Sequence, residues 1–160
     1  MPKKGASMRL RNRHRLRRRD IKRLREEAGI LLPEVEALEE AEMEDGTIVY
    51  LMGDSMIMAR RDGVLIPTLR SPILDALPSI VVDMGAVPHI CNGADVMAPG
   101  VVDVKGEFKA GEIVVVRDER HGKALAVGRA LFNSGEMKTL KRGKVVENLH
   151  YVGDRLWRAG

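Results

Sequence analysis

The sequence predicts an α+β fold: helices on a small antiparallel sheet in the N-terminal half, then a mainly β pseudo-barrel. In the first half, short apolar runs between residues 47 and 66 are separated by the turn pairs Gly53-Asp54 and Asp62-Gly63, as in a strand meander. In the second half, similar runs alternate with glycine turns around one small helix. About five or six short strands of this kind favour a compact barrel.

The elements of the first half follow from local patterns. Four apolar residues recur at helical spacing and predict a helix that ends at Gly29: Leu16, Ile21, Leu24 and Ala28. A second helix is expected to begin at Pro33, because proline suits a first helical position. It would carry an acidic outer face and an apolar inner face, formed by Glu34, Glu36, Glu39, Glu40, Val35, Leu38 and Met43. The meander and a short helix complete this half: 47–52, 56–60, 64–66 and 72–77.

The second half is predicted to be mainly strands. Five apolar runs are candidates: 80–83, 101–104, 113–117, 124–130 and 144–152. Pro88 suits the first turn of a short helix that ends near Asn92-Gly93. We expect residues 155–157 to add a closing strand. We divide the chain into a basic flexible tail (1–15), an N-terminal domain (16–77) and the barrel (79–158).

The net charge of +4 hides a strong asymmetry along the chain. Residues 1–25 hold 12 lysines and arginines and a single acid, Asp20, whereas the other 135 residues carry 15 basic and 22 acidic side chains. Such a cationic cluster indicates contact with a polyanion, since like charges otherwise repel one another. A solubilising tail or a solvated helix face would also fit. The candidate contacts are Arg11, Arg13, Arg15, Arg17, Arg18 and Arg19.

Composition also bounds the compartment. No apolar run approaches the roughly 18 residues of a transmembrane helix, and no apolar segment follows the basic N-terminus as in a signal peptide. Cys91 is the single cysteine, so an intrachain disulfide cannot form. A reducing environment is the usual home of such a chain. We therefore expect a cytoplasmic protein that has no membrane partner.

The sequence offers little for catalysis. Its histidines are scattered, and one cysteine cannot build a zinc site of paired thiolates. Cys91 and His89 are two positions apart, so on a helix they would face different directions. The glycine run matches neither of the two common phosphate-binding motifs. We expect a non-enzyme with no cofactor and no metal.

The glycine-punctuated run from Gly85 to Gly100 is the main candidate site. A glycine turn that leads into a short helix lets a nucleic-acid backbone approach bare main-chain N–H groups. The glycines could equally serve only tight turns. The candidate contacts in this half are Gly85, Ala86, Val87, His89, Asn92, Gly93, Arg129, Lys141 and Arg142.

Aromatic side chains are scarce, at 3 % of the chain, and most of them are expected in the core. Stacking on unpaired bases is therefore a minor contribution. Recognition should depend on phosphate and on RNA shape.

Several motifs in the second half are similar to one family. Asp83-Met84-Gly85-Ala86, Asn92–Gly100 and Ala126-Val127-Gly128 resemble the first strand, helix, turn and central strand of a PUA domain, a family named for pseudouridine synthase and archaeosine transglycosylase. The resemblance implies a PUA pseudo-barrel. It also implies that the surface from Gly85 to Gly93 faces RNA.

Two further motifs point to one branch of that family. Glu147–Trp157 and Pro67–Arg70 resemble the malignant-T-cell-amplified-sequence branch of archaeal type, which carries a characteristic N-terminal domain. The resemblance implies an RNA-binding factor on the small ribosomal subunit or tRNA, in translation initiation, reinitiation or recycling, with an SUI1-domain protein as partner. An RNA-targeting accessory in rRNA or tRNA modification, or in ribosome assembly, is the alternative. The chain departs from the branch at Pro88, where relatives have lysine, and in its arginine-rich N-terminus.

Overall fold

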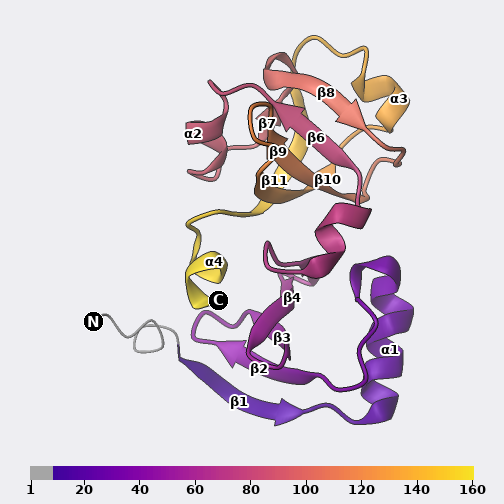
Figure 1. The fold of residues 1–160 in the computed structure, drawn as a ribbon, viewed down its shortest axis with the longest axis vertical. Coiled ribbons are helices and arrows are strands. Elements are labelled where there is room, and N and C mark those ends of the chain that lie inside the picture. The colour runs from indigo at the N-terminus through magenta and orange to yellow at the C-terminus, as the bar shows by residue number, and fades with distance from the viewer. Residues whose placement is uncertain (1–8) are drawn as a thin grey trace. The chain divides into compact units, whose positions relative to one another are not determined.

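The computed structural model describes residues 9–160 and forms two compact units (Figure 1). One unit extends to Ile73 and includes Arg158–Gly160, and the other is Leu74–Trp157. Each unit has its own sheet. The α+β fold class predicted from the sequence is confirmed.

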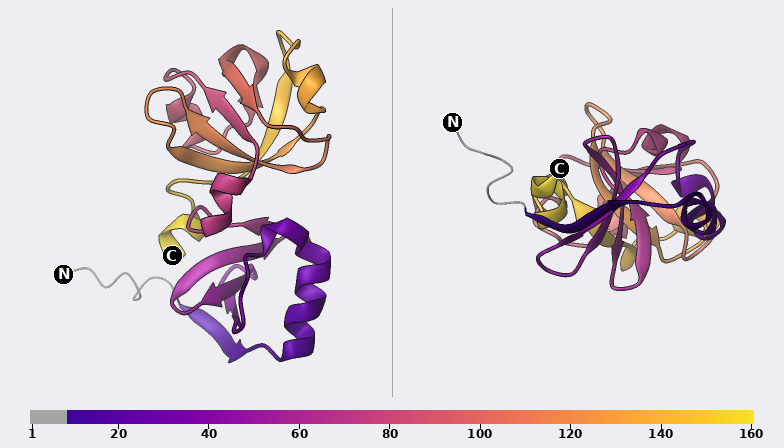
Figure 2. Two further views of the ribbon diagram at one scale, coloured as in Figure 1. Left: turned by 45° about the vertical axis from the view of Figure 1, so that its right-hand side comes forward. Right: turned by 90° about the horizontal axis from the view of Figure 1, so that it is seen from below.

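In the first unit, the strands of the described chain form one antiparallel sheet in sequence order. These strands are β1 (Leu10–Arg15), β2 (Glu39–Met43), β3 (Ile48–Met52), β4 (Ser55–Arg61) and β5 (Val64–Pro67). Helix α1 (Arg18–Ala28) lies against the sheet (Figure 2), and two 3-10 helices cover Gly29–Leu31 and Pro72–Ala76. The inner face of α1 contributes Ile21 and Leu24 to a core shared with Ile57 of β4. The predicted helix and meander are confirmed.

The flexible tail predicted for residues 1–15 is wrong where the structure describes it. Residues 10–15 form the edge strand β1, which pairs with β2. Charge complementarity explains the pairing. The Arg13 guanidinium lies 2.6 Å from a Glu39 carboxylate oxygen, and that of Arg11 lies 3.4 Å from Glu42. Residues 1–8 lie outside the described residues.

The second helix predicted from Pro33 is also wrong, because Glu39–Met43 is strand β2. Leu38, Ala41 and Met43 are buried, while the glutamates of the strand are half exposed. Glutamate is a good helix former, but tertiary contacts readily override helix propensity, and the arginine-rich β1 supplies cross-strand partners for these glutamates. The acidic run is therefore the complement of the basic one.

The second unit, Leu74–Trp157, holds a curled sheet in the order β7-β11-β10-β9-β6-β8. Its strands are β6 (Ser79–Val82), β7 (Val96–Met97), β8 (Val101–Lys105), β9 (Ile113–Asp118), β10 (Ala124–Ala130) and β11 (Lys144–Tyr151). The short helices are α2 (Val87–Ile90), α3 (Ser134–Met137), α4 (Arg155–Ala159) and the 3-10 helix Ala98–Gly100. β6 and β9 are parallel, whereas the other pairs are antiparallel.

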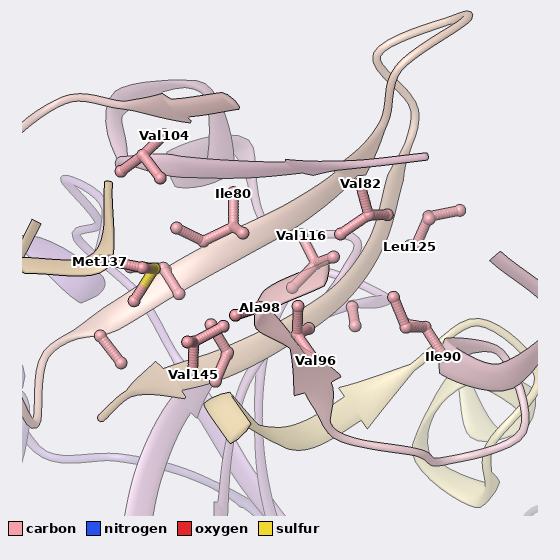
Figure 3. Close-up of a cluster of buried hydrophobic side chains, with 14 of the residues drawn as sticks. Ile80, Val82, Ile90, Val96, Ala98, Val104, Val116, Leu125, Met137 and Val145 are labelled. Atoms are coloured by element: carbon pink, nitrogen blue, oxygen red, sulfur yellow. The ribbon is translucent and has the colours of Figure 1, made fainter. Parts of the chain in front are cut away.

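Branched aliphatic side chains fill the interior of this sheet. Ile80, Val82, Val116 and Val145 converge there and are fully buried (Figure 3). Phe108 is the one aromatic ring that is fully buried in this core, within Leu74–Trp157. Small branched side chains therefore close the barrel, as the aromatic-poor composition required.

Three features of the second unit differ from the prediction or were missed. Residues 155–157 open helix α4, not a closing strand, because the Asp154 carboxylate accepts the Trp157 N–H at 2.7 Å in the manner of a helix N-cap. β7 is only two residues long and left no pattern. α3 was missed although Asn133 and Glu136 form a capping box.

Gly128 lies in β10 directly against the backbone and a side chain of β11. A Cβ atom at this position would collide with Val146 Cγ1 and lie 2.7 Å from the carbonyl oxygen of Glu147. Neither group belongs to a long flexible side chain that could turn aside. The glycine of the Ala126-Val127-Gly128 motif therefore has a steric cause.

We predict that Gly128→Ala lowers the free energy of unfolding by about 1–3 kcal/mol, because overpacking must shift one of the two strands. Chemical denaturation measures the effect. Gly135→Ala is the matched control: nothing lies within 4 Å of its Cβ, and a helical alanine is expected to stabilise by about 0.4–1 kcal/mol. Equal unfolding curves for the two variants would contradict the steric explanation.

We also predict that deleting residues 1–15 destabilises the first unit by roughly 2–4 kcal/mol, since several cross-strand hydrogen bonds of about 1 kcal/mol each are lost. Urea titration of the truncated chain measures the loss. Arg11→Gln/Arg13→Gln should reproduce a part of it, while Arg15→Gln/Arg18→Gln, with the same charge change, should not. An unchanged midpoint for the truncation would show that β1 contributes nothing.

Candidate nucleic-acid interface

The glycine turn before α2 does not offer the bare N–H groups that the sequence predicted. The Ala86 N–H donates to Asp83 Oδ1 at 2.9 Å, and the Met84 N–H donates to Glu119 Oε2 at 3.0 Å. Val87 N donates to the Met84 carbonyl. Carboxylates of the chain itself thus occupy two of the places where a phosphate was expected. Those two N–H groups are therefore not bare in this structure, and contact of RNA with the turn stays a prediction.

The other predicted residues of this surface differ in exposure. Gly85, His89 and Asn92 are exposed, whereas Ala86 and Val87 are half buried and pack against the core. Gly93 has φ +96°, and a Cβ there would meet the Tyr151 ring at 3.3 Å. Glycine is therefore required here for backbone conformation. The residues available to a ligand lie toward the C-terminal end of α2.

Asn148 of β11 ties the segment after α2 to the sheet. Its side-chain amide donates to the carbonyls of Ile90 and Ala94, and its backbone N–H donates to Asp95 Oδ1 at 2.8 Å. Burial alone would raise the pKa of Asp95, but the Asn148 N–H and the Lys144 ammonium, 2.9 Å from the carboxylate, together lower it. The loop is held by polar contacts at its base.

The β9–β10 hairpin adjoins this surface. Glu119 reaches the turn before α2, and the charge of Lys123 acts on Cys91 directly after α2. Burial raises the pKa of the Cys91 thiol, and Lys123 partly offsets that rise. Asp118 fixes the hairpin by accepting the His121 N–H at 2.6 Å.

The basic residues nominated in the second half behave differently. Arg129 is paired with Glu147 at 2.7 Å, so its charge is largely neutralised. Lys141 and Arg142 are exposed, and within the part of the chain that the structure describes neither has a carboxylate at ion-pair distance. Their loop leads into β11, which begins at Lys144. Asn148 lies four residues along this strand, or about 13 Å at roughly 3.3 Å per residue. One strand therefore connects the loop of Lys141 and Arg142 to the surface around α2, residues 85–93, which we call the α2 surface.

The six nominated arginines of the first unit also separate. Arg11 and Arg13 bridge β1 to β2, and Arg17 pairs with Asp20 at 3.1 Å. Arg15, Arg18 and Arg19 are exposed and have no ion pair with any described residue. Contact of these side chains with RNA stays a prediction.

Among residues 9–160, no three His, Cys, Asp or Glu side chains lie close enough to hold an ion. No helix in the described chain is both long enough and apolar enough to span a membrane.

Comparison with known proteins agrees with this fold. Residues 78–152 match the PUA domain family, so the second unit is a PUA domain. The chain is 38% identical to an uncharacterized protein of Methanocaldococcus jannaschii over 94% of this chain and 98% of that one. It is 32% identical to translation machinery-associated protein 20 of Eremothecium gossypii, over 84% and 79% of the two chains. A PUA domain crystal structure from Aeropyrum pernix covers 94% of this chain and 91% of its own, with 27% identity and a TM-score of 0.81.

These similarities show that the chain is a PUA-domain protein. More narrowly, the chain belongs to the family that includes translation machinery-associated protein 20 and malignant T-cell-amplified sequence 1. The resemblance seen in the sequence is confirmed.

A buried polar contact joins β11 to the start of α4 in the PUA domain. His150 Nδ1 lies 2.9 Å from Asp154 Oδ2, and both side chains are almost fully buried. Burial would raise the pKa of Asp154, but the His150 contact and two backbone N–H groups outweigh it and lower that pKa below its usual 3.8. The same carboxylate accepts the N–H of Tyr151 and of Trp157.

We predict that Asp154 makes the second unit acid-labile. Because its pKa is lower in the folded chain than in the unfolded chain, its contribution is fully present above about pH 4 and is lost as the pH falls through the folded pKa. Thermal melts from neutral pH down to about pH 3 measure this. Asp154→Asn should melt at a lower temperature at neutral pH, and its melting temperature should fall less steeply as the pH is lowered. Equal decreases in melting temperature for the variant and the wild-type protein would contradict the assignment.

Proposed function

We propose that this protein is a non-catalytic RNA-binding translation factor that acts on the small ribosomal subunit or on tRNA. Initiation, reinitiation or recycling is its stage, and the cytoplasm is its compartment. The observation that carries the proposal is identity of about one third, over most of both chains, with a protein named for the translation machinery. The PUA domain match supports RNA as the ligand.

The geometry supports non-covalent binding rather than catalysis. The α2 surface presents backbone, glycine and the exposed side chains of His89 and Asn92. The loop with Lys141 and Arg142 adds two exposed cations at the far end of β11. Positive charge and close main-chain approach hold a phosphate backbone without base readout. We further propose that an SUI1-domain protein is the partner on the ribosome.

Sedimentation with purified small ribosomal subunits tests the proposal. We expect the protein to migrate with the subunits at moderate salt and to be released as the salt rises. A protein that stays at the top of the gradient under all conditions would contradict it. Crosslinking that recovers precursor rRNA or a modifying enzyme would favour the accessory role instead.

We predict that Lys141→Glu/Arg142→Glu weakens RNA binding about 10-fold or more and lowers the salt slope by roughly 1–2, because two phosphate contacts are lost. Fluorescence anisotropy with small-subunit rRNA fragments measures both. Lys105→Glu/Lys109→Glu carries the same charge change on two exposed residues outside the proposed surface. Equal losses in the two double variants would mean that only net charge matters.

A further inference from the structure

The first two turns of α1 carry an unusual charge distribution. Asp20 is their one acid, while four cations lie on the exposed side: Arg18, Arg19, Lys22 and Arg23. The opposite side of the helix is buried through Ile21 and Leu24. The helix thus separates an apolar inner face from a cationic outer face.

This arrangement opposes the stability of the helix. The N-terminal end of a helix carries partial positive charge, so acids are favourable there and cations are not. Arg18 and Lys22, and likewise Arg19 and Arg23, are four residues apart, where like charges repel each other. A sequence selected for helix stability alone would place these cations in the last turn.

The structure supplies no intramolecular partner that would explain them. Among residues 9–160, none of the four cations lies within 4.0 Å of a carboxylate, including Glu26, which is four residues from Lys22; two other nearby acids already have partners. Asp20 pairs with Arg17 at 3.1 Å, and Glu27 makes two hydrogen bonds of 2.6 and 2.7 Å with Arg60. By contrast, Arg25 donates to two backbone carbonyls.

The four cations have a regular geometry. Arg18 and Lys22 are about 6 Å apart along the axis, and so are Arg19 and Arg23, so the cations form two short parallel rows. Arg15, exposed at the end of β1, precedes them in the chain. The exposed positions of α1 are otherwise Glu26 and Glu27, so the helix shows no outward apolar side chain with which to enter a membrane.

The two units also differ in charge. Residues 74–157 contain 11 basic and 11 acidic side chains, so the net charge of +4 arises outside the PUA unit. We therefore expect the other unit to add to the counterion release that Lys141 and Arg142 provide.

We propose that the outer face of α1, formed by Arg18, Arg19, Lys22 and Arg23, is a second RNA-binding surface that contacts the phosphate backbone without reading sequence. This goes beyond the proposed function, because the surface belongs to the N-terminal unit and acts independently of the PUA surface. Arg11, Arg13 and Arg17 stabilise the fold, and the α1 cations bind the ligand.

The test uses the full chain and an RNA hairpin with a mixed-sequence stem. Arg18→Gln/Arg19→Gln/Lys22→Gln/Arg23→Gln removes four charges while keeping good helix formers. We expect the slope of log affinity against log salt, measured between roughly 50 and 200 mM, to fall by about 3, and affinity to drop roughly 30-fold or more. The melting temperature should stay the same or rise, because repulsion is removed from the first turns.

A matched pair of double variants separates location from charge. Lys22→Gln/Arg23→Gln should weaken binding, whereas Lys105→Gln/Lys109→Gln should leave it nearly unchanged. Equal losses of RNA affinity in these two double variants would overturn the proposal. It would also be overturned if the fourfold α1 variant kept its RNA affinity but lost binding to vesicles of phosphatidylcholine and phosphatidylserine. If the fourfold variant loses hairpin affinity while wild-type protein ignores ribosomal subunits, the α1 surface stands and the ribosomal role fails.

Discussion

The position of the candidate RNA surface depends on the hydrogen bonds of Asn148. This residue lies in β11, the strand between β7 and β10. Its side-chain amide donates to carbonyls of Ile90 and Ala94, and its backbone N–H donates to Asp95, so these bonds fix the segment that follows α2. The same strand supplies Tyr151, whose ring supports Gly93, and Val146, which excludes any side chain larger than glycine at position 128. A loop of exposed, small residues is thus mounted on a buried strand, so its main chain is ordered before any ligand arrives.

Arginine has two uses in the first unit. Arg13 and Arg60 make close, double hydrogen bonds with glutamates of neighbouring elements, which suits the planar guanidinium. On α1, the same residue type points outward beside like charges. The difference lies in the partner, not in the local sequence. Arg13 pairs with Glu39 of β2 and Arg60 of β4 pairs with Glu27, whereas among residues 9–160 no carboxylate lies within 4.0 Å of the outward cations of α1.

That dependence on partners sets the limit of sequence-based prediction. β10 was predicted at its observed bounds, 124–130, because its apolar run and the glycine turn before it are local signals. β1 and β2 were missed because their evidence is the pairing of arginines with glutamates about 30 residues away. Residues 155–157 read as apolar and extended, yet a buried carboxylate at position 154 starts a helix there. The exposed residues of the α2 surface were nominated correctly as surface, but the carboxylates that reach its N–H groups come from Asp83 and, across the sheet, Glu119.

Those two carboxylates also bear on how a nucleic acid can lie on the PUA unit. With Asp83 and Glu119 accepting the N–H groups of the turn, the start of α2 presents negative oxygen atoms rather than bare donors, which disfavours a phosphate there. Lys123 lies near the other end of α2, beside Cys91, and Lys141 and Arg142 lie at the far end of β11. The charge pattern therefore favours a backbone that passes the C-terminal end of α2, near Asn92, and continues along β11.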